Sequence, residues 1–255
     1  FFNINKLDSK TFFKYLIIDS YKINKELFKE LKKRSQYTIN INDNYSKALK
    51  TDFFINYSDE EKNKKFYGIN KKSFKFKLLG KKYNFIYPNF KFKEKKKNFF
   101  NIFIYLGTLA QKKIITKIIK NLIYLKKKFN ILIISSSKIK SIKNIKIRTK
   151  KYVNKKEFLN EICNSDIVIC STGVTVFEAI SAKKIVFGVP ISKNQLNNFN
   201  ELKKLKLIDS LKNFPKLINR KNFFQKKNEY LKRNHYLRPY NHLFNIKQKI
   251  FPIKN

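Results

Sequence analysis

The chain has 255 residues, more than the roughly 100–200 of a usual single domain, so we expect one large domain or two smaller ones. Hydrophobic residues make up 42% of the sequence and aromatic residues 16%, which is enough apolar material for a core and excludes wholesale disorder. The formal net charge is +42, from 59 Lys and Arg against 17 Asp and Glu.

This charge points first to nucleic acid or an anionic surface as a partner. However, 54 of the basic residues are Lys and only 5 are Arg, the residue whose planar fork suits bidentate recognition of phosphates and bases. The Lys excess also accompanies many Asn, Ile, Phe and Tyr, all of which have AT-rich codons. We therefore favour codon bias as its cause and keep a lysine-rich nucleic-acid-binding protein as an alternative.

Cysteine usage and hydropathy indicate the compartment. Cys163 and Cys170 lie seven residues apart with no CxxC pair and no nearby His, so we expect buried thiols in a reducing compartment, and neither a metal site nor a cofactor. No run of 18 apolar residues predicts a membrane span, and no signal peptide is visible, so we expect a cytoplasmic protein. The sequence lacks Met and begins at Phe1, from which we expect that an N-terminal part is missing.

The first third of the chain alternates strand-like and helix-like segments. Residues 15–19 form a short continuous apolar run, typical of a strand buried on both faces. Asn24 is placed to cap a helix that ends at Lys33, and further strands are predicted over residues 37–41 and 53–55. The stretch 66–98 is long and basic, and the lysine-rich run 93–97 near its end is interpreted as a linker or solvated rim. We expect a Rossmann-like domain over residues 1–97.

The alternation is clearer in the middle of the chain. Strands are predicted over residues 101–106, 130–134, 166–170 and 185–188, and helices over residues 110–124, 155–163, 174–182 and 194–205. Four strands, each followed by a crossover, imply a mostly parallel sheet with helices on both faces, here a second α/β domain over residues 98–215. Residues 216–255 are expected to form a basic helical tail, with a helix over 223–233.

Ligands of open parallel sheets bind beyond the carboxyl ends of the strands, so the loops after the strands are the candidate sites. Gly107-Thr108 follows the strand over 101–106 and leads into a helix, a weak signal for a phosphate site. A stronger signal is the sequence Ser-Thr-Gly-Val-Thr-Val-Phe-Glu at 171–178. Its small hydroxyl residues and its glycine at a strand-to-helix junction suit an anion, and Glu178 could accept two hydrogen bonds from a ribose diol.

A purely structural interpretation of the same segment is equally open from the residues alone. In that interpretation Ser171 or Thr172 caps the helix, and Glu178 only complements the helix dipole.

The segment continues through Val189-Pro190 to Lys193-Asn194-Gln195, and over residues 166–207 it resembles the donor-nucleotide motif of two-domain GT-B proteins. Short motifs of the first half follow the order seen in the UDP-sugar hydrolase of pseudaminic acid biosynthesis and related spore-coat polysaccharide biosynthesis proteins. These motifs are Leu-Ile-Ile-Asp-Ser-Tyr at 16–21, Ile-Asn-Asp at 41–43, Asp-Phe-Phe-Ile-Asn at 52–56, Leu-Gly-Lys-Lys-Tyr at 79–83 and Tyr-Pro-Asn-Phe at 87–90. The resemblance covers roughly residues 14–208.

The resemblance implies an α/β fold of two Rossmann-like domains with parallel sheets, the first of them truncated. It implies that Glu178 binds the uridine ribose and that Asn194 and Gln195 face the sugar-phosphate. Tyr21, at the sugar end of the cleft, and Asn194 are the implied catalytic residues. The implied contacts to the diphosphate are Gly107, Thr108, Ser171, Thr172, Gly173, Val174 and Thr175.

The implied reaction is attack by water that releases UDP from a UDP-activated acetamido sugar in surface-glycan biosynthesis. The implied partner is therefore a small nucleotide sugar, without a metal or a cofactor. A glycosyltransferase of the same architecture, using a UDP-sugar donor, is the enzymatic alternative.

The sequence departs from the family pattern at three places. No His precedes His235, so the family's N-terminal loop with its His is not represented, and Ser20 stands where the family has a His before the tyrosine. The Gly-Gly-x-Asp turn of the family is Gly-Thr-Leu-Ala at 107–110. These departures predict either that the N-terminal loop is missing or that the activity is lost.

Overall fold

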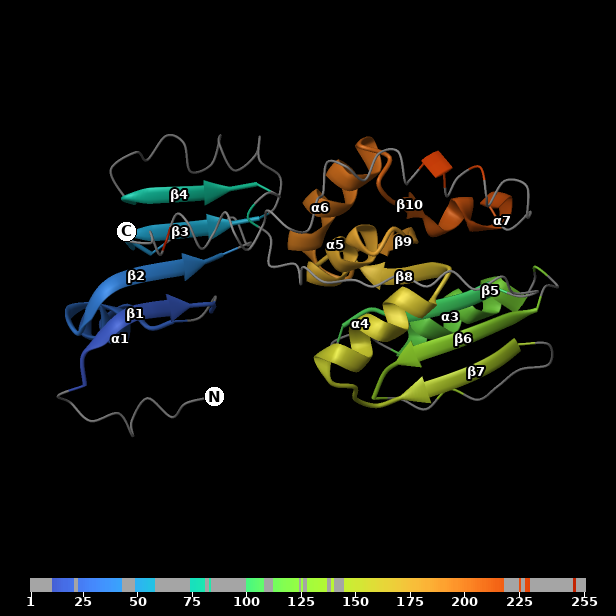
Figure 1. Ribbon diagram of the computed structural model, residues 1–255, viewed down its shortest axis with the longest axis horizontal. Coiled ribbons are helices and arrows are strands. Elements are labelled where there is room, and N and C mark those ends of the chain that lie inside the picture. Colours follow the sequence, from blue (N-terminus) through green and yellow to red (C-terminus); the bar gives the residue numbers. More distant parts are fainter. Residues whose placement is uncertain are drawn as a thin grey trace. The chain divides into compact units, whose positions relative to one another are not determined.

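The computed structural model describes residues 11–20, 23–42, 49–57, 74–80, 83, 100–107, 112–123, 125, 128–136, 139, 145–217, 225, 228, 229 and 250. The chain divides into two compact units (Figure 1): residues 1–84 with 244–255, and residues 85–243. In the part of the chain that is described, each unit contains one parallel sheet. The finer expectation of domains at 1–97, 98–215 and 216–255 stays a prediction, and the tail helix expected over 223–233 lies almost wholly outside the described residues.

The sheet of the first unit has the order β1-β2-β3-β4. Its elements are β1 (Phe13–Ile18), α1 (Lys25–Lys33), β2 (Ser35–Ile41), β3 (Phe53–Asn56) and β4 (Phe76–Leu79). Asn24 caps α1 as predicted, because its side chain accepts a hydrogen bond from the Glu26 N–H at 2.9 Å. Phe28 and Leu31 of α1 are buried, as the helical spacing indicated.

The run 93–97, interpreted as a linker or solvated rim, lies outside the described residues. Earlier in the basic stretch 66–98, where no strand was predicted, the chain forms strand β4. This strand pairs with β3 in parallel register, and the rings of Phe53 and Phe76 stack with centroids 5.0 Å apart. Phe76 and Lys77 alone do not mark a strand, because the pairing partner lies more than 20 residues earlier in the chain.

The described strands of the second unit form a parallel sheet in the order β10-β9-β8-β5-β6-β7. Its first half contains β5 (Phe100–Tyr105), α3 (Lys112–Ile123), β6 (Phe129–Ile134) and β7 (Ile145–Lys150). Its second half contains α4 (Lys155–Asn164), β8 (Ile167–Ser171), α5 (Val174–Ser181), β9 (Ile185–Val189) and α6 (Lys193–Lys204). Two-residue β10 (Asp209–Ser210), a 3-10 turn (Leu211–Asn213) and α7 (Phe214–Leu217) follow. In Figure 1 the arrows of β6, β7 and β8 point the same way.

Helices cover both faces of this sheet, as predicted. Ile102, Ile104 and Leu106 alternate toward one face, where they join the buried cluster that includes Ile115 and Ile119 of α3. On the other face, Phe103 meets Phe158 of α4 edge-on, with ring centroids 5.4 Å apart. β7 and β10 are strands that the sequence analysis did not predict.

Strand β9 carries a glycine for which the packing leaves no room for a side chain. A Cβ at Gly188 would lie 2.7 Å from Ile208 Cδ1 and 2.8 Å from Thr172 Cγ2. The small residue therefore lets the loop after β8 lie directly against β9.

Candidate functional site

The predicted binding residues of the second unit gather at the carboxyl ends of its strands. Gly107 follows β5 with φ +88°, a left-handed conformation that glycine adopts without strain. A Cβ built at Gly107 would lie 3.7 Å from Ile191 Cδ1, so the turn after β5 lies beside the loop after β9. Between β5 and β9 in the sheet runs β8, whose carboxyl end leads into α5.

The loop from β8 into α5 leaves the start of the helix without a side-chain cap. Ser171 is the last residue of β8, and Gly173 is the N-cap of α5, where no side-chain hydrogen bond forms within the described residues. Thr172 Oγ1 donates instead to the Gln195 carbonyl oxygen at 2.9 Å. The capping roles considered for Ser171 and Thr172 are therefore wrong. Val174 and Thr175 begin the helix, whose first N–H groups are available to an anion.

Helix α6 holds this loop in place and directs an amide toward it. The Asn198 side chain is buried and donates to the Thr172 carbonyl oxygen at 3.2 Å. The Gln195 Oε1 atom accepts a hydrogen bond from the Ile191 N–H at 3.2 Å. Its Nε2 atom lies 3.7 Å from where a Cβ of residue 173 would stand, so the amide donor faces the start of α5. The structure thus brings Gln195 and Gly173 together.

Asn194, the predicted catalytic partner of Gln195, lies in the first turn of α6. Its Oδ1 atom accepts a hydrogen bond from Ser192 Oγ at 2.5 Å. Tyr21 and Thr108 fall outside the described residues, so the catalytic role of Tyr21 and the diphosphate role of Thr108 stay predictions.

Glu178 is a buried acid that pairs with a lysine from another helix. Its side chain is 2% exposed, and its Oε1 atom forms an ion pair with Nζ of Lys155, whose side chain is 54% exposed. Burial raises the pKa of Glu178 above its ordinary value, while the hydrogen bond and charge of Lys155 act in the opposite direction. A role confined to complementing its own helix dipole does not account for this pairing across helices.

Aromatic and thiol side chains surround this ion pair. Burial and then the charge of Glu178 raise the pKa of Tyr105, the last residue of β5. The Tyr105 ring meets Phe158 edge-on, with centroids 5.0 Å apart, and Lys155 Nζ lies 5.6 Å from the Phe158 ring centre. Burial, followed by the charge of Glu178, also raises the pKa of Cys170 far above its ordinary range.

Lys155 and Tyr105 were not among the predicted site residues. Both follow the rule that ligands of open parallel sheets bind beyond the strand ends, since Tyr105 ends β5 and Lys155 begins the helix after β7. The position of a residue at a strand end was therefore the signal that could have found them. In a sequence with 54 lysines, the residue type itself carries little information.

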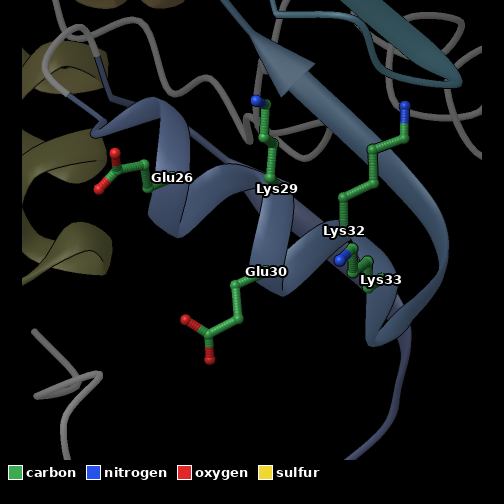
Figure 2. A pocket seen from close by; sticks show the side chains of 5 residues that line it. All are labelled: Glu26, Lys29, Glu30, Lys32 and Lys33. Atoms are coloured by element: carbon green, nitrogen blue, oxygen red, sulfur yellow. The ribbon is translucent and has the colours of Figure 1, made fainter.

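The first unit carries an open hollow of about 630 Å³ over α1 (Figure 2). Among the described residues, those that line it all belong to that helix: Glu26, Lys29, Glu30, Lys32 and Lys33. Figure 2 shows Lys29 and Lys32 directed to one side of the helix and Glu30 to the other. Since none of the described strands contributes to the hollow, we interpret it as the solvated face of an amphipathic helix.

The exposed lysines of the described residues are spread over several helices. Each of α1, α3, α4 and α6 carries at least two. The part of the chain that is described holds no group of three or more His, Cys, Asp and Glu arranged to bind a metal ion. Among the described helices, none combines the length and the apolar character needed to cross a membrane.

Comparison with known proteins places the fold. No protein-family model matches the sequence, and no curated protein matches it. The structure is similar to that of MurG from Acinetobacter baumannii, with 16% identity and a TM-score of 0.53, over 84% of this chain and 67% of that chain. It is also similar to Arabidopsis thaliana UGT89C1 in complex with UDP-L-rhamnose, with 8% identity and a TM-score of 0.52, over 94% of this chain and 64% of that chain.

UGT89C1 in complex with quercetin is similar to the same degree, with 8% identity and a TM-score of 0.53, over 94% of this chain and 65% of that chain. These neighbours are GT-B glycosyltransferases, and the chain has their α/β fold with parallel sheets. The chain spans about two thirds of their length. The comparisons do not single out the pseudaminic acid branch, to which the motif order pointed.

Proposed function

We propose that the second unit binds a nucleoside diphosphate sugar at the carboxyl edge of its sheet and that the protein is a GT-B glycosyltransferase. The observation that carries the proposal is Glu178, a carboxylate 2% exposed that lies more than one turn into a helix. Within the described part of the chain, no side chain caps the start of that helix. A buried carboxylate is suited to accept hydrogen bonds from the two hydroxyls of a ribose. The uncapped N–H groups are suited to the diphosphate that is joined to that ribose.

The residues around the start of α5 support a diphosphate at this position. Gly173 has no side chain to block the approach of a phosphate. The Gln195 amide, from α6, adds a hydrogen-bond donor close to Gly173. The dipole of α5 favours negative charge at the same end. Gly107 lies at the turn after the neighbouring strand β5, at the same carboxyl edge of the sheet.

In the proposed reaction, the bond between the anomeric carbon and the diphosphate oxygen breaks while an acceptor oxygen bonds to that carbon. The nucleoside diphosphate leaves with the electron pair of the broken bond, and the proton of the acceptor hydroxyl passes to water. Backbone donors placed where the leaving charge develops lower the barrier. The similarity of the fold to GT-B glycosyltransferases, one solved with UDP-L-rhamnose, supports transfer as the leading candidate.

Hydrolysis is the second candidate, and the motif order over residues 14–208 favours it. Water then takes the place of the acceptor and releases UDP from a UDP-activated acetamido sugar. In this candidate Tyr21 and Asn194 are the residues that the resemblance places beside the sugar.

The binding site is tested by calorimetric titration of UDP into the chain and into a Glu178→Gln variant. Loss of the charged hydrogen bonds to the ribose should weaken binding roughly 10- to 100-fold. Glu157→Gln is the matched control, because Glu157 is 41% exposed and its partner Lys150 keeps a second acid, Glu161. Equal UDP affinity for the wild type and Glu178→Gln would contradict the proposed site.

Incubation with UDP-N-acetylglucosamine in the absence of an acceptor separates the two reactions. Hydrolysis predicts steady release of UDP in water alone. Transfer predicts release that requires an added acceptor, and both predict that Glu178→Gln slows the release.

A further inference from the structure

The ion pair between Lys155 and Glu178 joins two unequally exposed groups. The Glu178 side chain is 2% exposed, whereas the Lys155 side chain, at the first position of α4, is 54% exposed. The ammonium thus contacts the carboxylate while much of its side chain remains in water. A buried carboxylate without a partner takes up a proton at neutral pH, because burial penalises the charged form.

We propose that Lys155 is a positioning residue that keeps Glu178 ionised, and therefore able to accept the ribose hydroxyls of a nucleotide. The inference rests on the proposed function for the role of the ribose. The ion pair itself does not depend on that function and can be tested separately.

Of the described groups that interact with Glu178, Lys155 is the one that can keep its carboxylate ionised. Tyr105 of β5 and Cys170 of β8 interact electrostatically with Glu178, and neither can supply a positive charge, because a phenol and a thiol are neutral or negative in either protonation state. Lys155, from α4, is the charged residue that acts on Glu178 among the described residues. Removing the ammonium raises the pKa of Glu178 further, because the opposing influence of burial remains.

A protonated Glu178 presents a hydroxyl in place of one acceptor oxygen, and the pair of hydrogen bonds from a ribose diol is then lost. In Lys155→Met, UDP affinity should therefore depend on pH. Below the raised pKa it should fall by up to about tenfold for each pH unit until it reaches that of Glu178→Gln, and it should recover toward that of the wild type as the pH rises above the raised pKa.

The first experiment follows the carboxyl carbon of Glu178 by NMR in protein labelled at the glutamate side-chain carboxyl, with Glu178→Gln to assign the signal. Lys155→Met should move the titration midpoint to higher pH, and Lys155→Arg should keep it near that of the wild type. Lys156→Met is the control, because Lys156 is the exposed neighbour on the same helix turn. An unmoved midpoint in Lys155→Met would overturn the proposal.

The second experiment measures UDP binding from about pH 6 to about pH 9 for the same variants. The Lys156→Met control corrects for the titration of UDP itself, because Lys156→Met and Lys155→Met bind the same ligand at the same pH. Equal weakening of Lys155→Met at every pH would identify Lys155 as a direct ligand contact and overturn the proposal, as would unchanged or tighter binding. Lys155→Arg should restore the wild-type pH profile, and its failure to do so would also count against the proposal.

The two experiments separate the inference from the proposed function. If the wild type binds no UDP, the proposed function and the ribose role fail together, and the NMR midpoints still decide whether Lys155 keeps Glu178 ionised. If the wild type binds UDP through Glu178 and the pH profile of Lys155→Met is flat, the function stands and the inference fails.

Discussion

Glu178 and Lys155 differ in what their removal leaves behind. Loss of Glu178 leaves a lysine whose side chain is 54% exposed, and water can solvate its charge. Loss of Lys155 leaves a buried carboxyl, which must take up a proton to avoid an uncompensated buried charge. Glu178→Gln is therefore the cleaner probe of ligand binding, and Lys155→Met is the cleaner probe of pH dependence.

The two cysteines should differ sharply in reactivity. Cys170 is fully buried at the end of β8, and burial followed by the charge of Glu178 raises its pKa. Cys163 is only partly buried, and the charge of Lys184 opposes the rise in its pKa that burial causes. Because the thiolate is the reactive form, alkylation of the folded protein at about pH 8 should leave Cys170 unmodified and modify Cys163 slowly.

Mass spectrometry of the peptides, before and after unfolding in guanidinium chloride, checks this prediction. Both thiols should react once the chain is unfolded. Alkylation of Cys170 as fast as that of Cys163 in the folded protein would mean that the end of β8 is open to solvent.

At the scale of elements, α5 and α6 are both terminated by a lysine in a backbone conformation that is unusual for lysine. Each is followed by a lysine with a left-handed backbone, Lys183 at φ 54° and Lys206 at φ 56°. After α5, the Lys184 N–H donates to the Ala179 carbonyl at 3.1 Å and the Lys183 N–H to the Ile180 carbonyl at 2.8 Å, which is the pattern of a Schellman motif. Glycine usually occupies this position, and the sequence contains only five glycines.

Lys183→Gly and Lys206→Gly should each therefore raise the free energy of unfolding. The left-handed conformation costs a lysine about 1 kcal/mol, and the greater freedom of glycine in the unfolded chain offsets part of the gain. We expect about 0.5 kcal/mol per site in urea denaturation. The matched control is Lys120→Gly, an exposed position inside α3, which should destabilise the protein by up to about 1 kcal/mol. Destabilisation by all three variants would contradict the strain argument.

At the scale of the whole molecule, the charge is the dominant feature. The net charge is +42, and α3 carries exposed lysines at 112, 113, 117 and 120 without any acidic residue. Like charges at this spacing repel one another, and they also raise the self-repulsion of the folded chain. The described lysines lie on several helices, which favours codon bias as the cause of the lysine excess. Whether the chain binds nucleic acid is decided by a direct binding measurement.

Added NaCl should therefore stabilise the protein, because salt screens repulsion between exposed charges. Between about 0.01 M and about 0.3 M, we expect about 1 kcal/mol or more, which corresponds to a rise in Tm of roughly 2–4 °C. A variant with Lys113, Lys117 and Lys120 replaced by Gln should show a smaller salt dependence in thermal melts followed by circular dichroism. A Tm that falls with salt would show that attractive pairs outweigh the repulsion.

The sequence by itself determined the α/β class, most of the alternation of strands and helices from residue 100 to residue 205, and the candidate nucleotide-binding segment at 171–178. These features depend on local periodicity and on the chemistry of neighbouring residues, both of which are visible along the chain. Only the tertiary structure decided that β4 and β7 are strands, that Thr172 bonds to α6 instead of capping α5, and that Lys155 meets Glu178. Each of these depends on contacts between segments separated in the sequence, and local pattern does not specify which of many lysines or short apolar runs will form them.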